Sequence, residues 1–298
     1  MAIPKISKFL VLVALLTGSI GTEAMLLALS SPVQAQEAPP QKPPIGVIGQ
    51  DDRVTPSYSW MKRNKRKAVG QLEIQKADGK FYSCTFTVVG TNLGLTNTHC
   101  LLDDEGNGPL QVKAYAISHG SRYYKAANVD VIWTGLDFSP RTVGDYRRDW
   151  AIVRFNRSLG KSTGWFGQTN WSTDINQAGL TAVGKKVNLI GYSGDWPTAE
   201  KAQPGDIRGQ TPGAHFNCNF LSVEIGLIIH DCDGTPGSSG TGIHTRNRKL
   251  QGLQVATVFD PKTKITAFSV AVPIDRFMPA LVALRKTKGA GSTIVPRI

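Results

Sequence analysis

The sequence has few of the residues that bind metals in proteins. Its 298 residues include only four cysteines and five histidines. None of them occurs in the C-x-x-C or H-x-x-x-H spacing that is typical of zinc sites. We therefore expect neither a metal ion nor any other cofactor.

Long hydrophobic runs are also missing, apart from one interrupted run near the N-terminus. Residues 9–16 and 25–29 are apolar, but a polar break that includes Glu23 separates them. Neither piece approaches the roughly 20 residues that a transmembrane helix needs. Two lysines before the first piece and small residues up to Ala35 are typical of an export signal. We therefore predict a cleaved signal peptide over residues 1–35 rather than a membrane anchor. The mature protein is then secreted or periplasmic and has no membrane span.

Acidic residues are the minority among the charged residues. The chain has 34 Lys and Arg against 22 Asp and Glu, which gives a formal net charge of +12. Removal of residues 1–35 takes away two lysines and one glutamate, so the charge of the mature chain is +11. A basic surface favours acidic substrates, anionic cell surfaces or nucleic acid. We favour solubility outside the cell as the reason for this charge. Anionic cell surfaces are a further possible binding partner of the protein, and no nucleic-acid partner is expected.

Proline and charge divide the rest of the chain. Residues 36–67 are Pro-rich at first and predict an extended leader or propeptide-like segment rather than a packed element. This segment ends in a basic cluster at residues 62–67. The cluster is either a processing site that frees Ala68 or an exposed loop, and we favour the loop. Residues 287–298 are expected to form a short tail.

Between these segments the pattern predicts many short strands and one helix. Such a series, with Gly, Pro, Asp and Asn between the runs, is typical of a β-sandwich or β-barrel. Residues 274–286 predict a helix because Phe277, Leu281 and Leu284 fall on one face. The expected strands are residues 68–76, 81–89, 110–119, 123–133, 150–155, 187–192, 214–220, 227–230, 250–258 and 265–272.

The four cysteines all follow the expected signal peptide. An even number in an exported chain favours two disulfides. Three pairings of Cys84, Cys100, Cys218 and Cys232 are allowed, of which Cys84 with Cys100 and Cys218 with Cys232 are the local ones.

Three short segments together indicate serine acyl transfer. A serine hydroxyl needs a histidine to accept its proton and a buried carboxylate to orient that histidine. His99 follows a strand-like run, Asp149 opens an apolar strand, and Ser239 lies among glycines. Read singly, each could be structural: a histidine beside a cysteine, a turn aspartate and a Gly/Ser-rich turn. Read together, they follow the order His, Asp, Ser, and we take them as a catalytic triad.

The nucleophile has a rival in the neighbouring Ser238. Only Ser239 has glycine both two residues before it and directly after it. That arrangement suits a group of backbone N–H donors, so Gly237 and Ser239 are expected to supply the oxyanion hole.

These segments resemble the trypsin/chymotrypsin family of serine peptidases. The resemblance is carried by T-N-T-H-C at residues 96–100, D-W-A-I-V at 149–153 and G-S-S-G at 237–240. Residues 48–53 (I-G-Q-D-D-R) and 191–195 (G-Y-S-G-D), with the T-P-G-S-S-G run, are similar to the bacterial glutamyl-endopeptidase-like (V8-like) branch.

The resemblance implies an all-β fold of two six-stranded antiparallel β-barrels with a C-terminal helix. The peptidase domain would span residues 68–286, with the boundary between barrels near 160–180. His99 and Asp149 would lie on the first barrel and Ser239 on the second, with the active site in the cleft between them. The pair Cys84–Cys100 matches the family's histidine-loop disulfide. The implied function is a monomeric secreted endopeptidase that cleaves protein or peptide substrates through an acyl-enzyme.

Several positions depart from the family pattern. Ser238 stands where trypsin-like zymogens usually carry Asp, so the usual activation ion pair is not expected. Asp233 has the spacing of a carboxylate at the base of a pocket for Lys or Arg, but we favour a role in structuring its own loop. Gln254 replaces the histidine of glutamate-specific relatives, so strict glutamate cleavage is not expected. Thr257 is expected on the pocket wall.

Two other functions remain open at this stage. One is a catalytically silent basic binding module on the same fold. The other is an esterase that uses the same acyl chemistry without cleaving peptides.

Overall fold

The computed structural model describes residues 44–63, 66–168 and 184–287 of the chain. The expected signal peptide, the first part of the leader and the C-terminal tail after Thr287 lie outside the described residues. Within the described part, no helix has the length and apolar character needed to cross a membrane.

The first half of the described chain forms a closed antiparallel barrel. Its strand order is β1-β2-β3-β6-β5-β4, and β1 pairs with both β2 and β4 to close the ring. Apolar side chains from successive strands fill its interior, among them Leu72, Phe86, Leu95 and Ile152. The strands are β1 (Val69–Gln75), β2 (Phe81–Val88), β3 (Leu93–Thr96), β4 (Gln111–Ala116), β5 (Lys125–Thr134) and β6 (Ala151–Phe155).

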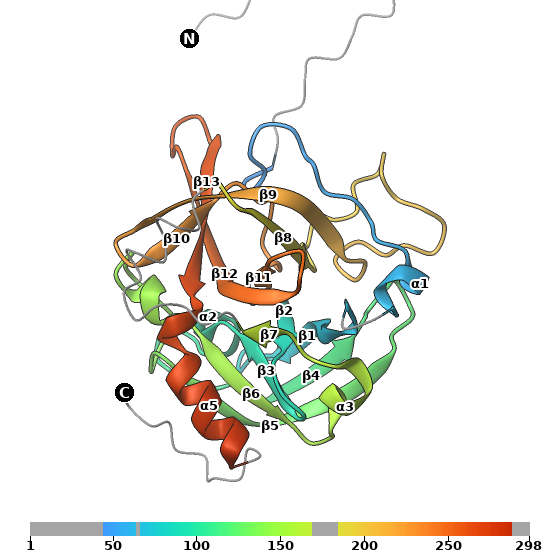
Figure 1. Cartoon of the computed structure of the whole chain (residues 1–298), viewed down its shortest axis with the longest axis vertical. Helices are drawn as coiled ribbons and strands as arrows, with labels where there is room; N and C mark the ends of the chain where they lie inside the picture. The colour runs from blue at the N-terminus through green and yellow to red at the C-terminus, as the bar shows by residue number, and fades with distance from the viewer. Residues whose placement is uncertain (1–43, 64–65, 169–183, 288–298) are drawn as a thin grey trace, which may run out of the picture. The chain divides into compact units, whose positions relative to one another are not determined.

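The second half forms another six-stranded barrel, in the order β11-β8-β9-β10-β13-β12 (Figure 1). Pairing of β11 with β12 closes this ring, and the short β7 adds to β12 in parallel outside it. The strands are β7 (Gly167–Gln168), β8 (Lys186–Gly191), β9 (Gly213–Glu224), β10 (Leu227–His230), β11 (Gly242–His244), β12 (Lys249–Phe259) and β13 (Thr266–Pro273). The predicted two-barrel fold is therefore confirmed.

Helices in the described part of the chain are few and mostly one turn long. The C-terminal helix begins with a 3-10 turn, and its α-helical part α5 starts at Met278 with proline at the next position. Proline suits the first helical turn because its missing N–H would have no partner there. The helix contacts the first barrel, since Arg285 donates to the carbonyl of Val89 over 2.7 Å. The helices are α1 (Tyr58–Met61), η1 (Arg66–Ala68), α2 (Thr98–Leu101), η2 (Asp145–Arg148), α3 (Leu159–Thr163), η3 (Ile274–Arg276) and α5 (Met278–Lys286).

The ten predicted strands and the predicted helix are all present, within a few residues of their expected ends. Three strands were not predicted: β3, β7 and β11. Both disulfides join the local pairs, Cys84 with Cys100 and Cys218 with Cys232.

The described part of the expected leader differs from the prediction, because residues 44–63 are packed rather than extended. Val47 and Arg53 are each only 1% exposed. Val54 forms an antiparallel bridge to Ala214 at the start of β9. Gly46 donates to Thr266 Oγ1 over 2.8 Å, which ties the same segment to β13. The segment is thus a part of the second barrel's surface.

Arg53 explains much of this packing. Its guanidinium binds Asp51 within the segment and Asp195 in the loop after β8, with N–O distances of 2.8 and 2.9 Å. Burial alone would raise the pKa of Asp195, but hydrogen bonds from Arg53 outweigh it and hold that pKa below its usual value. The buried charge is therefore paired on both sides, and the segment is fixed to the loop that carries the G-Y-S-G-D sequence.

Candidate active site

His99 is positioned by the short helix α2, which follows β3 directly. The side chain of Asn97 donates to the Asp149 carbonyl over 2.6 Å, and Thr98 Oγ1 donates to the Trp150 carbonyl over 2.9 Å. The disulfide from Cys100 attaches the same helix to β2. Two hydrogen bonds therefore fix the backbone around His99 relative to the start of β6, and the disulfide fixes it relative to β2.

Asp149 and His99 are in direct contact. Asp149 Oδ2 lies 2.6 Å from His99 Nδ1, and Oδ1 accepts the backbone N–H of His99 over 3.1 Å. The Asp149 side chain is 0% exposed, whereas that of His99 is 27% exposed. A buried carboxylate at this distance favours the tautomer with hydrogen on Nδ1, which leaves Nε2 as the proton acceptor.

The loop that carries Ser239 is fixed against β2 of the first barrel. Thr85 donates its backbone N–H to the Ser239 carbonyl over 2.8 Å and its hydroxyl to the Gly237 carbonyl over 2.9 Å. The same hydroxyl accepts the backbone N–H of Tyr192 over 2.9 Å. Thr85 adjoins Cys84, whose disulfide partner follows His99, so the loop and the histidine share one anchoring strand.

The structure brings the predicted residues together to different degrees. His99 and Asp149 touch through their side chains. Ser239 reaches the same region through its backbone contact with Thr85, and among the described residues no hydrogen bond joins its hydroxyl to the His99 ring. Ser239 is partly exposed, whereas its rival Ser238 is only 2% exposed and faces Gly234 inside the loop.

Gly237 has a conformation that requires glycine. Its φ is +101°, and an added Cβ would lie 2.4 Å from the Tyr192 carbonyl. The preceding Pro236 carbonyl accepts the N–H of Gly194 over 2.7 Å. In a trans peptide the C=O and N–H point in opposite directions, so the N–H of Gly237 points away from Gly194. The G-Y-S-G-D loop therefore sets the orientation of the peptide between Pro236 and Gly237. The N–H of this peptide is the predicted oxyanion donor of Gly237.

Asp233 is closed off from substrate by the packed N-terminal segment. Its carboxylate is 0% exposed and accepts the backbone N–H groups of Ile48 and Asp52, each over 2.9 Å. His215 Nδ1 lies 3.2 Å from the same carboxylate. This geometry does not match a pocket carboxylate for Lys or Arg, and the carboxylate holds the N-terminal segment rather than its own loop. The partner of this carboxylate is residues 48–52, a contact that the sequence pattern did not indicate.

Gln254 is engaged by a buried histidine that the sequence analysis missed. His230 Nε2 lies 2.7 Å from Gln254 Oε1, and His230 Nδ1 accepts the backbone N–H of Cys232 over 3.2 Å. Burial lowers the pKa of His230 to about 4, so the ring is neutral at pH 7. Thr257 lies on the same strand, β12, and is partly buried. His230 gave no sequence signal because it ends an apolar strand like any polar boundary residue.

Two groups of side chains in the described chain have the proximity of metal ligands. Cys84, His99 and Cys100 form one, but both sulfurs are in the disulfide. The other is Asp52, His215 and Asp233. There, the Asp233 oxygens accept backbone N–H groups and His215 Nδ1 accepts the Asp233 N–H over 3.0 Å. These are the contacts of a structural hydrogen-bond network.

A His–Asp pair on one closed barrel and a glycine-rich serine loop on a second barrel define a trypsin-like fold. The family profile of the trypsin-like peptidase domain matches residues 83–253, more than half of the chain. The chain therefore belongs to the trypsin-like peptidase family, and it is a serine endopeptidase. This match confirms the family resemblance that the sequence motifs indicated.

Solved structures of peptidases share the fold at low sequence identity. A Glu endopeptidase in complex with MPD superposes with a TM-score of 0.59 at 18% identity, covering 82% of this chain and 100% of that chain. The thermostable serine protease AL20 from an extremophilic microorganism gives 0.57 at 14% identity, covering 74% and 98%. The protease Anisep from Arthrobacter nicotinovorans gives 0.54 at 14% identity, covering 72% and 96%. No curated protein sequence matches the chain.

Proposed function

We propose that this peptidase is exported and cleaves peptide bonds through an acyl-enzyme on Ser239, with His99 and Asp149 as the other members of the triad. The observation that carries the proposal is the 2.6 Å contact between the buried Asp149 carboxylate and His99 Nδ1. This contact leaves Nε2 of a partly exposed imidazole for proton transfer.

The chemistry follows from these positions. As Ser239 Oγ attacks the substrate carbonyl carbon, its proton passes to His99 Nε2, and the carbonyl oxygen gains the negative charge. The imidazolium, stabilised by Asp149, then gives that proton to the leaving nitrogen as the C–N bond breaks. In the second half, water loses a proton to His99 as it attacks the ester carbon, and Ser239 recovers its hydrogen as the ester bond breaks.

The oxyanion would be stabilised by the backbone N–H groups of Gly237 and Ser239. Support comes from two contacts that hold this loop without the substrate: Gly194 N–H to the Pro236 carbonyl, and Thr85 Oγ1 to the Gly237 carbonyl. Donors held in place before the reaction stabilise the developing charge without a reorganisation cost.

We further propose that the primary pocket selects uncharged side chains. The Asp233 carboxylate is occupied by backbone N–H groups, and Gln254 is a neutral amide bound to a neutral histidine. Neither group offers a charge to Lys, Arg or Glu. The uncharged Thr257 on β12 is in keeping with such a pocket.

Export of the protein is supported by two disulfides and by the signal-like N-terminus. A secreted or periplasmic monomer that acts on protein or peptide substrates is the corresponding proposal. The basic surface stays available for anionic cell surfaces.

Casein hydrolysis by matched serine variants tests the proposed function. Ser239→Ala should reduce hydrolysis to background, whereas Ser238→Ala should keep most of it if the protein folds normally. Circular dichroism melting curves of both variants check folding. A wild-type protein that binds an anionic resin but does not hydrolyse casein would favour the silent binding module instead.

A further inference from the structure

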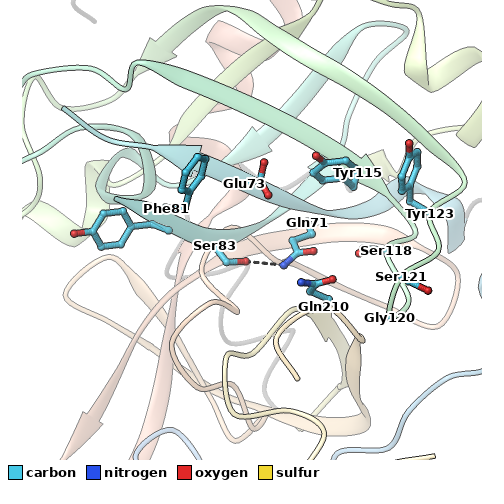
Figure 2. A pocket seen from close by; sticks show the side chains of 11 residues that line it. Gln71, Glu73, Phe81, Ser83, Tyr115, Ser118, Gly120, Ser121, Tyr123 and Gln210 are labelled. Carbon is cyan, nitrogen blue, oxygen red and sulfur yellow. Dashed lines mark hydrogen bonds between the residues drawn. The ribbon is translucent and has the colours of Figure 1, made fainter. Parts of the chain in front are cut away.

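A second pocket lies on the outer face of the first barrel. Its volume is about 350 Å³, and β1, β2 and β4 form its floor, with the segment 118–123 on one side (Figure 2). The lining residues are Gln71, Glu73, Phe81, Tyr82, Ser83, Tyr115, Ser118, Gly120, Ser121, Tyr123 and Gln210.

The strand register places this pocket close to the proposed nucleophile. Gln71 in the pocket is the cross-strand partner of Thr85, whose N–H binds the Ser239 carbonyl. Two residues further along the same pair of strands, Glu73 is the cross-strand partner of Ser83. The pocket therefore begins at the cross-strand partner of the residue that binds the Ser239 carbonyl, and Glu73 lies about 7 Å further along β1.

The floor of the pocket is fixed and presents hydrogen-bond acceptors. Gln71 is only 9% exposed, and its Nε2 donates to Ser83 Oγ over 2.9 Å and to the Gly209 carbonyl over 2.7 Å. Because both amide hydrogens are used, the atom that remains for a ligand is the acceptor Oε1. The Glu73 carboxylate lies beside it (Figure 2). Both groups suit a ligand that donates hydrogen bonds.

Aromatic rings form the wall above these acceptors. The rings of Tyr115 and Tyr123 are 5.2 Å apart and tilted, and Phe81 at the other side is 62% exposed. Burial raises the pKa of Tyr115, and the charge of Glu73 raises it further. Ring faces attract cations, and a carboxylate beside them adds a charge-assisted hydrogen bond.

Two lysines of the chain already contact pocket side chains in this way. Lys76 Nζ lies 5.3 Å from the centre of the Tyr82 ring, and Lys113 Nζ lies 3.9 Å from Glu73 Oε1. The side chains of Lys113 and Glu73 are 40% and 42% exposed, so their contact is weak and a ligand can displace it.

We propose that this pocket binds a Lys or Arg side chain of the polypeptide substrate, a few residues away from the bond that is cleaved. That the pocket receives a part of the substrate rests on the proposed function. The preference for a cation rests on the Glu73 carboxylate, the acceptor of Gln71 and the aromatic wall. A guanidinium fits best, because its planar set of donors can meet Glu73 and Gln71 while it stacks on a ring.

Peptide binding to the Ser239→Ala protein tests the pocket without turnover. The probes are acetyl-Gly-Gly-Arg-Gly-Gly-amide and its citrulline counterpart, which has nearly the same shape and no charge. Calorimetry should give about tenfold tighter binding of the arginine peptide. Adding Glu73→Gln should bring the two affinities within about twofold of each other. Adding Asp130→Asn, which removes an exposed carboxylate elsewhere on the same barrel, should leave the preference unchanged.

Equal affinities for the two peptides, or a preference that survives Glu73→Gln, would overturn the proposal. Cleavage of a random peptide library by the otherwise wild-type enzyme separates this result from the catalytic claim. Absence of all cleavage contradicts the proposed function, while the binding comparison still decides the pocket. If the peptides are cleaved but Lys and Arg are enriched at no position, the pocket proposal is contradicted. It is also contradicted if Glu73→Gln leaves every such enrichment unchanged.

Discussion

The two halves of the proposed active site are held in different ways. On the first barrel, His99 and its neighbour Thr98 contact Asp149 and Trp150, which directly precede β6, the strand that pairs with β3 before the His99 helix. On the second barrel, the Ser239 loop is held by segments from elsewhere in the chain: Thr85 on β2, Gly194 after β8, and Gly46 near the N-terminus. The base is thus positioned within one barrel, whereas the nucleophile depends on contacts between barrels and with the N-terminal segment.

The largest effect is expected from the first-barrel half. Asp149→Asn keeps the shape of the side chain but favours the wrong histidine tautomer, so kcat/KM should fall by about 10⁴-fold. Initial rates on a peptide substrate at neutral pH measure this loss. A decrease of less than tenfold would show that Asp149 is not the orienting group.

Arg53→Met should affect the second-barrel half of the site by lowering the free energy of unfolding rather than by removing a reacting group. It leaves Asp51 and Asp195 without their buried cation, and loss of one partner of such a cluster costs roughly 3–5 kcal/mol. Urea unfolding followed by tryptophan fluorescence measures the change. Asp130→Asn, which breaks an exposed ion pair with Arg154, is the matched control and should cost less than about 1 kcal/mol.

The two disulfides allow a direct comparison of the barrels. They close similar loops, with sequence separations of 16 and 14, so removal of either should cost about 3 kcal/mol of stability. At a temperature where both variants remain folded, the variant without Cys84–Cys100 should lose more activity than the variant without Cys218–Cys232. The reason is that only Cys84–Cys100 joins the His99 helix to the strand that holds the Ser239 loop. Equal losses of kcat in the two double-alanine variants would contradict this difference.

Thr85→Val tests the contact between the barrels. The variant keeps the shape of the side chain but loses the hydroxyl that holds the Gly237 carbonyl, so kcat should fall about 10- to 100-fold with KM little changed. Thr85→Ser should recover most of kcat because it restores the hydroxyl. A valine variant as active as the wild type, together with a defective serine variant, would mean that the methyl group, not the hydrogen bond, is what the site needs.

A smaller effect is expected from the buried histidine behind Gln254. Since the pKa of His230 is lowered to about 4, its neutral form stabilises the fold, and this contribution is complete above the usual histidine pKa near 6.5. The unfolded chain binds the proton first as pH falls, so this stability is lost between about pH 6.5 and pH 4. His230→Gln should flatten the dependence of the unfolding free energy on pH over that interval. A slope identical to that of the wild type would argue against a depressed pKa.

The sequence predicted those parts of the fold that local patterns determine. Alternating apolar residues identified ten strands, and the spacing of Phe277, Leu281 and Leu284 identified the helix. The strands β3 and β11 were missed because they are short and contain glycine, so their own residues carry little strand preference. Gly94 in β3 is needed because a Cβ there would lie 2.5 Å from the Phe155 ring, which is a property of the closed barrel.

The candidate site was predictable to the same extent. His99, Asp149 and Ser239 stood out through their neighbours in the chain and their order. The role of Thr85 could not be predicted, because a threonine in a strand is common and its partners lie more than 100 residues away. The packing of residues 44–55 was missed because they follow the Pro-rich start of the leader, which favours an extended chain, whereas Arg53 and Asp195 supply the tertiary contact that holds them.

Location of a fluorophosphonate adduct by peptide mass spectrometry tests the central claim most directly, because the probe reacts only with an activated serine hydroxyl. We expect a single adduct on Ser239, formed more slowly in both Asp149→Asn and Thr85→Val, since one disables the base and the other loosens the loop. An adduct on Ser238, or a labelling rate that neither substitution changes, would contradict the claim that the two barrels together activate Ser239.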